Sequence, residues 1–204
     1  AWADQTTGGG DGSFANNVGS GGGLSQVFAQ PNYQAGLNAP TGSNPPSAAI
    51  SGFRAVPDMA LDADPLTGPA VAYNARFGGG LIPVGGTSAA APEAAAMWAL
   101  VLQACKASTS CNTGGATGYR LGNPNGVLYS IYNGKKPLPY AQVFYQVLYG
   151  ENQANNNKGT PVIPAPGPPI TGCCTAGAGY NMVTGLGVPF AGHLIQAITG
   201  AQVP

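Results

Sequence analysis

Ser88 is the residue whose type and surroundings are best suited to covalent chemistry. It lies in the segment Gly-Gly-Thr-Ser-Ala-Ala-Ala-Pro, residues 85–92, where an apolar helix is predicted to begin. Its hydroxyl is therefore expected near backbone N–H groups that have no partner within the helix, and such groups favour developing negative charge. Gly85 and Gly86 allow a sharp turn and leave room for a substrate backbone to approach. The pattern indicates a serine nucleophile, although a serine here can also be an ordinary helix N-cap.

The elements expected around Ser88 are two strands and a long helix. Residues 71–76 and 81–84 read as strands, and the second one leads the chain to the serine. Residues 94–102, soon after Pro92, are apolar on every side, which predicts a helix in the middle of a protein. Pro92 is expected near the first turn, where it removes at most about one hydrogen bond.

Other segments are predicted more coarsely. Strands alternating with helices indicate an α/β layered fold. The remaining expected elements are an amphipathic piece at 24–34, an extended segment at 53–61, a turn at 64–68, helices at 123–132 and 189–199, and an aromatic segment at 139–149. Glycine-, proline- and asparagine-rich stretches before, between and after these elements read as loops, the longest at 150–172.

Composition excludes several classes of function. The chain has 204 residues, which suits one domain with a real core, and only 7% of them are charged, seven basic against seven acidic. Without a basic patch, binding to nucleic acid or to an anionic membrane surface is not expected. A protein with so few carboxylates loses little stability when they become protonated. The composition is therefore compatible with an acidic environment.

Four cysteines indicate an exported protein. Cys105 and Cys111 flank a short polar loop after the long helix, a natural place for a small disulfide. Cys173 and Cys174 are adjacent, so they can close a vicinal ring or one of them can reach another chain. Zinc is not favoured, because no histidine lies nearby. We expect a secreted, extracellular or periplasmic protein that is the processed product of a precursor.

Four blocks of sequence together resemble the carboxyl-terminal half of the sedolisins, the serine-carboxyl peptidases with a subtilisin-like fold. They are residues 20–25 (Ser-Gly-Gly-Gly-Leu-Ser), 54–68, 85–92 and 177–189, in the expected order. The block at 85–92 suits a subtilisin equally well, whereas Asp-Ala-Asp-Pro-Leu-Thr-Gly and Thr-Gly-Leu-Gly favour a sedolisin. The resemblance implies an α/β fold of subtilisin type with a mostly parallel sheet, of which residues 1–204 supply the carboxyl-terminal part.

The resemblance also implies roles for residues. Ser88 would be the nucleophile of an acid-active endopeptidase that cleaves proteins or peptides through an acyl-enzyme and needs no cofactor. The family's base, a glutamate oriented by an aspartate, and its oxyanion-binding aspartate all precede the region that this chain matches. Glu93 is too closely tied to the serine's own helix to replace them. The expected partner is therefore the amino-terminal chain of the same precursor.

Two alternatives remain open. The chain could be an inactive, sedolisin-like binding module, or a subtilisin-like peptidase whose histidine base lies on the missing half. His193 follows the serine, whereas a subtilisin places its histidine before it, so we interpret His193 as a surface or capping residue. The aspartates Asp58, Asp62 and Asp64 could mark a substrate subsite, but hydrogen bonds in turns and at strand ends are the favoured interpretation.

The resemblance also implies a calcium site near the carboxyl end, formed by two aspartates and several backbone carbonyls. At the matching positions this chain has Gln146 and Asn181. Losing two negative charges weakens calcium binding greatly, even though amide oxygens can coordinate. We therefore expect no bound metal, and hydrogen bonds between these two side chains and the backbone of residues 177–179.

Overall fold

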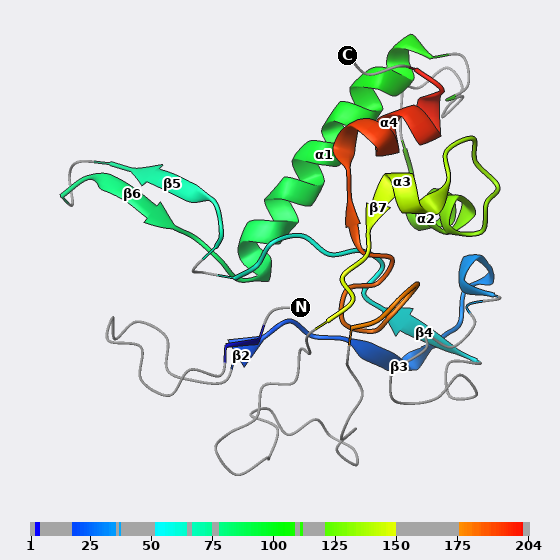
Figure 1. Cartoon of the computed structure of the whole chain (residues 1–204), viewed down its shortest axis with the longest axis horizontal. Helices are drawn as coiled ribbons and strands as arrows, with labels where there is room; N and C mark the ends of the chain where they lie inside the picture. The colour runs from blue at the N-terminus through cyan, green and yellow to red at the C-terminus, as the bar shows by residue number, and fades with distance from the viewer. Residues whose placement is uncertain are drawn as a thin grey trace.

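The computed structural model describes residues 3–4, 18–35, 37, 52–64, 67–74, 78–108, 111, 121–149 and 176–201. A long helix, α1 (Thr87–Ala107), runs through this part of the chain (Figure 1). Helix α4 (Ala191–Thr199) packs along its carboxyl-terminal half, and α2 (Asn125–Tyr132) and the short α3 (Tyr140–Val143) follow beside α4.

Helix α1 is preceded by a glycine, Gly86, and followed by a serine, Ser108. Gly86 has a φ of 78°, a backbone conformation that favours glycine. At the other end the Ser108 hydroxyl donates to the carbonyl of Thr199, at 2.7 Å, and so joins the ends of α1 and α4. Cys105 and Cys111 form the disulfide that their spacing predicts. Cys173 and Cys174 lie outside the described residues.

All the strands among the described residues pair in antiparallel, two-stranded sheets. The pairs are β1 (Ala3–Asp4) with β2 (Val18–Gly19), β3 (Gly23–Ala29) with β4 (Phe53–Val56), β5 (Ala70–Tyr73) with β6 (Gly80–Pro83), and β7 (Phe144–Tyr145) with β8 (Val188–Pro189). The expected mixture of helices and strands is found. The expected mostly parallel sheet is not found in the described part of the chain, where each strand has one antiparallel partner. Strand β6 leads into α1, but in the described part of the chain it pairs only with β5.

The hydrophobic core lies between the carboxyl-terminal half of α1 and the segments after residue 121. Its large, fully buried side chains come mainly from α2, the α3–β7 segment, the loop before β8, and α4. They are Val101, Leu128, Tyr129, Ile131, Val143, Phe144, Tyr180, Met182, Leu186 and Leu194. Tyr129 lies between Tyr33 and Tyr180, with ring centroids 5.3 and 6.3 Å away. The core thus packs against the carboxyl-terminal half of α1, whereas Ser88 lies at the other end of this helix.

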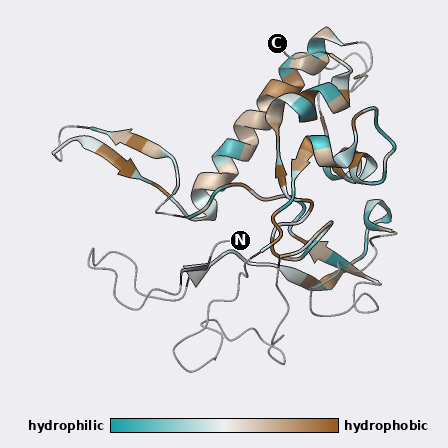
Figure 2. Cartoon of the chain, in the orientation of Figure 1, coloured by the Kyte–Doolittle hydropathy of each residue, from teal (hydrophilic) through white to brown (hydrophobic). Residues whose placement is uncertain are grey.

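The prediction that α1 is buried on every side is wrong for the described structure. Met97, Val101 and Cys105 are buried against the core, but Leu100 remains 50% exposed. The cause is that α4 is the helix packed against α1, and it covers one face of the longer helix. The β5–β6 hairpin is exposed along both strands, and Figure 2 shows hydrophobic residues on each of them.

Most of the other predicted elements are confirmed with shifted boundaries. The strands predicted before Ser88 form the β5–β6 hairpin, and the predicted helices at 123–132 and 189–199 are α2 and α4. The piece at 24–34 is instead β3 followed by a single 3-10 turn, Asn32–Gln34, because Pro31 interrupts it. Pro92 lies in the second turn of α1 and not in the first. The loop predicted at 150–172 lies outside the described residues.

Candidate active site at the amino-terminal end of helix α1

Backbone hydrogen bonds hold the turn that carries Ser88. The N–H of Gly86 donates to the carbonyl of Ala63, at 2.7 Å, and the N–H of Val84 donates to the carbonyl of Pro69, at 3.0 Å. A Cβ on Gly68 would collide with the carbonyl of Val84, so the two segments pass closely only because residue 68 is glycine. Ala63, Gly68 and Pro69 thus fix the position of the turn before the helix.

The Ser88 side chain is exposed, whereas the next residue, Ala89, is buried. The hydroxyl makes no hydrogen bond to any residue within the described part of the chain. Pro92 lies four positions later and has no N–H, so it cannot donate to the carbonyl of Ser88 as a helical residue normally would. The first turn of α1 presents an exposed hydroxyl, and within this turn the N–H of Ala89 donates to the carbonyl of Gly86, at 3.0 Å. An accessible hydroxyl is what a nucleophile requires, and the start of a helix favours negative charge.

Glu93 does not face Ser88. Five residues along an α-helix correspond to a rotation of about 140° around its axis, so the two side chains leave α1 in different directions. Glu93 is half-buried on the flank of the helix. This agrees with a structural role, and it leaves the serine without a base from its own helix.

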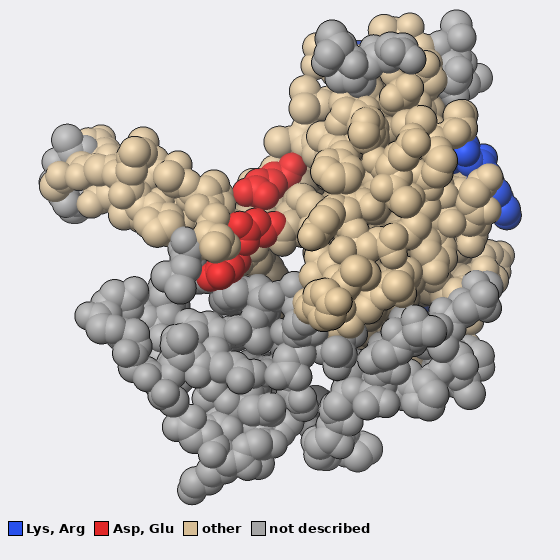
Figure 3. Space-filling view, in the orientation of Figure 1, with Lys and Arg blue, Asp and Glu red and all other residues tan. Residues whose placement is uncertain are grey.

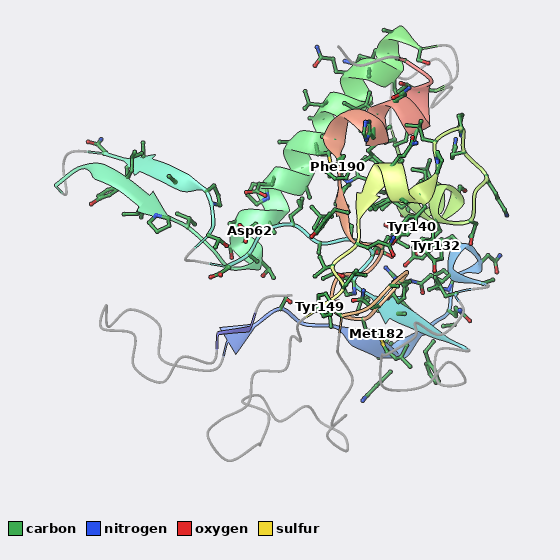
Figure 4. The ribbon with its side chains drawn as sticks, viewed as in Figure 1. Asp62, Tyr132, Tyr140, Tyr149, Met182 and Phe190 are labelled. Atoms are coloured by element: carbon green, nitrogen blue, oxygen red, sulfur yellow. A yellow bond between two sulfur atoms is a disulfide. The ribbon has the colours of Figure 1, made fainter. Side chains whose placement is uncertain are left out.

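Acidic side chains gather at the base of α1, beside the hairpin, as Figure 3 shows. Asp62, labelled in Figure 4, accepts hydrogen bonds through Oδ1 from the N–H of Asp64, at 3.0 Å, and from the hydroxyl of Thr67, at 3.3 Å. These are the turn hydrogen bonds that the sequence predicts for this aspartate. Asp62 therefore shapes the loop that supports the Ser88 turn.

Asp58 belongs to a second polar cluster, away from the start of α1. Its carboxylate forms an ion pair with Arg54 and accepts a hydrogen bond from the Tyr129 hydroxyl, at 2.9 Å. Gln34, fully buried, donates to the oxygen of Tyr129, at 2.8 Å, and its Oε1 accepts from the N–H of Ala55, at 3.0 Å. The cluster ties β4 to α2 and so has a structural role, as the sequence favours for Asp58.

Burial and charge shift two pKa values in this cluster. Burial lowers the pKa of Arg54, but the hydrogen bond and the negative charge of Asp58 outweigh it, so the net shift is upward. Burial, with the neighbouring Tyr180, raises the pKa of Tyr129 well above its usual range. Sequence reasoning missed Gln34 and Tyr129, since nothing in their spacing shows that residues 95 apart share a hydrogen bond.

His193 is exposed on α4, where its Nδ1 lies 2.6 Å from the carbonyl oxygen of Gln142. Figure 1 shows α4 beside the carboxyl-terminal half of α1, away from the end that carries Ser88. The interpretation of His193 as a surface residue is confirmed.

The described residues contain no group of three or more His, Cys, Asp or Glu side chains that could hold a metal ion. At the positions where the resemblance implies calcium, Gln146 accepts a hydrogen bond from the N–H of Gly179, at 2.8 Å, and Asn181 donates to the carbonyl of Gly177, at 3.0 Å. The hydrogen bonds expected there are confirmed. Among the same residues, no helix has the length and apolar character needed to cross a membrane.

Comparisons with known proteins agree with this architecture. Kumamolisin of Bacillus sp. (strain MN-32) is 34% identical over 180 residues, which cover 88% of this chain. This chain is a relative of the sedolisins. The solved structure of Pseudomonas sedolisin, a serine-carboxyl proteinase complexed with two molecules of pseudo-iodotyrostatin, superposes with a TM-score of 0.58 at 21% identity and covers 98% of this chain. No protein-family model matches the sequence.

The match covers only part of each relative. The chain spans 25% of the length of kumamolisin and 45% of the sedolisin chain. The sedolisin structure supports a fold of subtilisin type for this chain, and the role of Ser88 as a nucleophile stays a prediction.

Proposed function

We propose that this chain is the serine-bearing part of a secreted, acid-active serine-carboxyl endopeptidase of sedolisin type. The observation that carries the proposal is the exposed Ser88 hydroxyl at the start of α1, after a turn that is held by backbone hydrogen bonds to Ala63 and Pro69. The relationship to kumamolisin supports the same chemistry. The substrates are proteins or peptides, and no cofactor takes part.

In the proposed reaction the Ser88 oxygen attacks the carbonyl carbon of the scissile peptide bond while a carboxylate accepts its proton. The carbonyl oxygen becomes an oxyanion, which the positive end of the α1 dipole stabilises together with a protonated carboxyl group. The peptide C–N bond then breaks, the amine takes the proton and leaves, and an ester remains on Ser88. Water hydrolyses this ester and restores the hydroxyl.

The carboxylate base explains activity in acid. A histidine base is protonated below about pH 6, whereas a carboxylate with an ordinary pKa near 4 still accepts protons there. No described carboxylate hydrogen-bonds to Ser88. We therefore propose that the glutamate, its orienting aspartate and the oxyanion-binding aspartate lie on the amino-terminal part of the sedolisin fold, supplied by the amino-terminal chain of the same precursor.

Exposed apolar side chains on α1 and on the β5–β6 hairpin support this missing partner. Leu100 on α1 is 50% exposed, and on the hairpin Leu81 is 70% and Ile82 is 45% exposed. Large exposed apolar patches usually mark surfaces that another polypeptide covers. The proposed amino-terminal part covers them, and its strands complete the mostly parallel sheet that residues 1–204 lack in the described structure. Residues 1–204 are thus the carboxyl-terminal part of one catalytic domain.

The rate of hydrolysis of a denatured protein, measured against pH with the complete protein, tests the proposal. Activity should be highest below about pH 5 and should fall toward neutral pH. A maximum near neutral pH would point instead to a histidine base on the missing half. No hydrolysis at any pH, from a preparation that contains the amino-terminal part, would favour the inactive binding module.

A further inference from the structure

We propose that two amides, Gln146 and Asn181, form a hydrogen-bonded lock in place of the calcium site that the family resemblance implies, so that this protein binds no calcium there. The lock joins the segment after β7 to the loop at 176–187. The proposal rests on the orientation of the two side chains, and it does not depend on the proposed peptidase activity.

The orientation of the Asn181 amide is fixed by three donors. Its Oδ1 accepts hydrogen bonds from the N–H of Val183, at 3.1 Å, from the N–H of Thr184, at 2.9 Å, and from the Thr184 hydroxyl, at 3.1 Å. Rotating the amide by half a turn would place its NH2 group against two backbone N–H donors, which cannot accept a hydrogen bond. The oxygen of Asn181 is therefore fully used inside its own turn.

The NH2 group of Asn181 faces the backbone oxygen that a metal would need. Nδ2 donates to the carbonyl of Gly177, at 3.0 Å, and the side chain is almost wholly buried. A calcium ion takes six to eight oxygen ligands, at about 2.3–2.6 Å. Here a hydrogen with positive partial charge occupies the direction in which that carbonyl would bind the ion. This donor set repels a cation.

Gln146 completes the lock from the other segment. Its Oε1 accepts from the N–H of Gly179, at 2.8 Å, so it is paired with a donor and carries no charge. The approach of the two segments is close, because a Cβ on Gly187 would collide with the carbonyl of Tyr145. Neutral amides that already have partners neither attract a divalent ion nor offer it free oxygens.

The lock acts on the segment that supports the candidate active site. Two backbone hydrogen bonds join the loop at 176–187 to the segment after β4. The N–H of Ala60 donates to the carbonyl of Gly187, at 3.0 Å, and the N–H of Leu186 donates to the carbonyl of Asp58, at 2.9 Å. This same segment continues to Ala63, which binds Gly86 at the start of α1. The amides therefore perform, without a metal, the bracing between the carboxyl-terminal loop and the turn before Ser88.

Thermal unfolding of the complete protein, in millimolar calcium chloride and in a chelator, tests the lock. Gln146→Ala should lower the unfolding midpoint by about 2 to 4 °C, and by the same amount in both conditions, because it removes a hydrogen bond and not a ligand. Asn133→Ala, at an exposed amide after α2, is the matched control and should change little. A decrease seen only in calcium would identify Gln146 as a ligand and overturn the proposal.

A second variant tests whether an acidic side chain at position 181 restores calcium binding. Asn181→Asp replaces the NH2 group with an oxygen that repels the carbonyl of Gly177 unless a cation lies between them. Its midpoint in chelator should be below that of the unaltered protein, and calcium should raise it more than it raises the unaltered protein. If the variant and the unaltered protein were equally stable in chelator, the Asn181–Gly177 hydrogen bond would not contribute to stability. If this variant does not fold, the Gln146→Ala comparison still decides, and peptidase activity enters neither readout.

Discussion

The two ends of helix α1 lie in opposite surroundings. At the carboxyl-terminal end, Val101 and Cys105 are fully buried, a disulfide closes the next loop, and Ser108 binds the end of α4. At the amino-terminal end, Ser88 is exposed and the neighbouring hairpin has no buried residue in either strand. The chain thus packs a core at one end of the helix and exposes the proposed nucleophile at the other.

With Ser88 as the proposed nucleophile, stability and chemistry are divided along one helix. The packed end derives its stability from apolar area that this chain buries by itself. The open end has the geometry of a nucleophile but not the covering that would exclude water from a reaction. The end that carries the proposed nucleophile is therefore the one that we expect to depend on the rest of the sedolisin fold.

The largest expected effect is on the open end. In the complete protein, Ser88→Ala should lower kcat by roughly 10⁶-fold, because removing the nucleophile of a serine peptidase removes nearly all of its catalysis. The rate of peptide hydrolysis measures the loss, and circular dichroism checks that the fold is intact. Activity retained at the original level would exclude Ser88 as the nucleophile.

Ser108→Ala is the matched control at the packed end of the same helix. It removes the hydrogen bond to Thr199 and should cost about 1 kcal/mol of unfolding free energy, with kcat unchanged. If the two serine variants lowered activity equally, the division between the ends of α1 would be wrong.

The next effect belongs to the polar cluster below the core. Asp58→Ala leaves Arg54 without its partner and Tyr129 without its acceptor, so unfolding free energy should fall by about 3 kcal/mol. Chemical denaturation measures this change. Asp58→Asn keeps an acceptor for Tyr129 and should lose less. Equal losses would show that the charge of Asp58 contributes nothing.

High pH should weaken the packed end. Burial is the main cause that raises the pKa of Tyr129 and of Tyr180. Burial raises the pKa of Tyr140 as well. The folded chain therefore keeps protons that the unfolded chain releases above its ordinary tyrosine pKa of about 10. The unfolding free energy should be unaffected below that pH and should fall above it, by about 1.4 kcal/mol per pH unit for each of the three tyrosines. Tyr129→Phe should remove about a third of this dependence of the unfolding free energy on pH, as measured by denaturation curves. An unchanged dependence would contradict the assignment.

The smallest effect tests whether the open face of α1 is covered. Leu100→Lys should lower the unfolding free energy of the complete protein by about 1–2 kcal/mol, because the exposed half of Leu100 becomes buried there. Gln103→Lys, at an exposed polar position of the same helix, is the control and should change it by less than about 0.5 kcal/mol. No difference between the two would mean that the face of Leu100 stays in water.

Sequence reasoning succeeded where the signal is local. The glycine turn and the apolar run placed Ser88 at a helix start, and the spacing of Cys105 and Cys111 gave their disulfide. The replacement of two acids by Gln146 and Asn181 predicted their hydrogen bonds to the backbone. In each case neighbouring residues, or a motif, carry the information.

It failed where partners come from distant parts of the chain. The apolar residues of α1 predicted burial on all sides, because a sequence does not state which other segments are present to cover a helix. The cluster of Gln34, Tyr129 and Asp58 joins segments 71 and 95 residues apart, and no periodicity relates them. The expected parallel sheet likewise depends on strands that must meet across long separations.

The projecting hairpin has a consequence for handling the polypeptide. Within the described part of the chain, strands β5 and β6 pair only with each other, so each has an unbonded outer rim of N–H and C=O groups. Such rims, beside side chains such as Leu81 and Ile82, are templates on which further molecules add strands. Produced without its complement, the polypeptide should self-associate through this hairpin, and a charge introduced there, such as Ile82→Lys, should keep it dispersed.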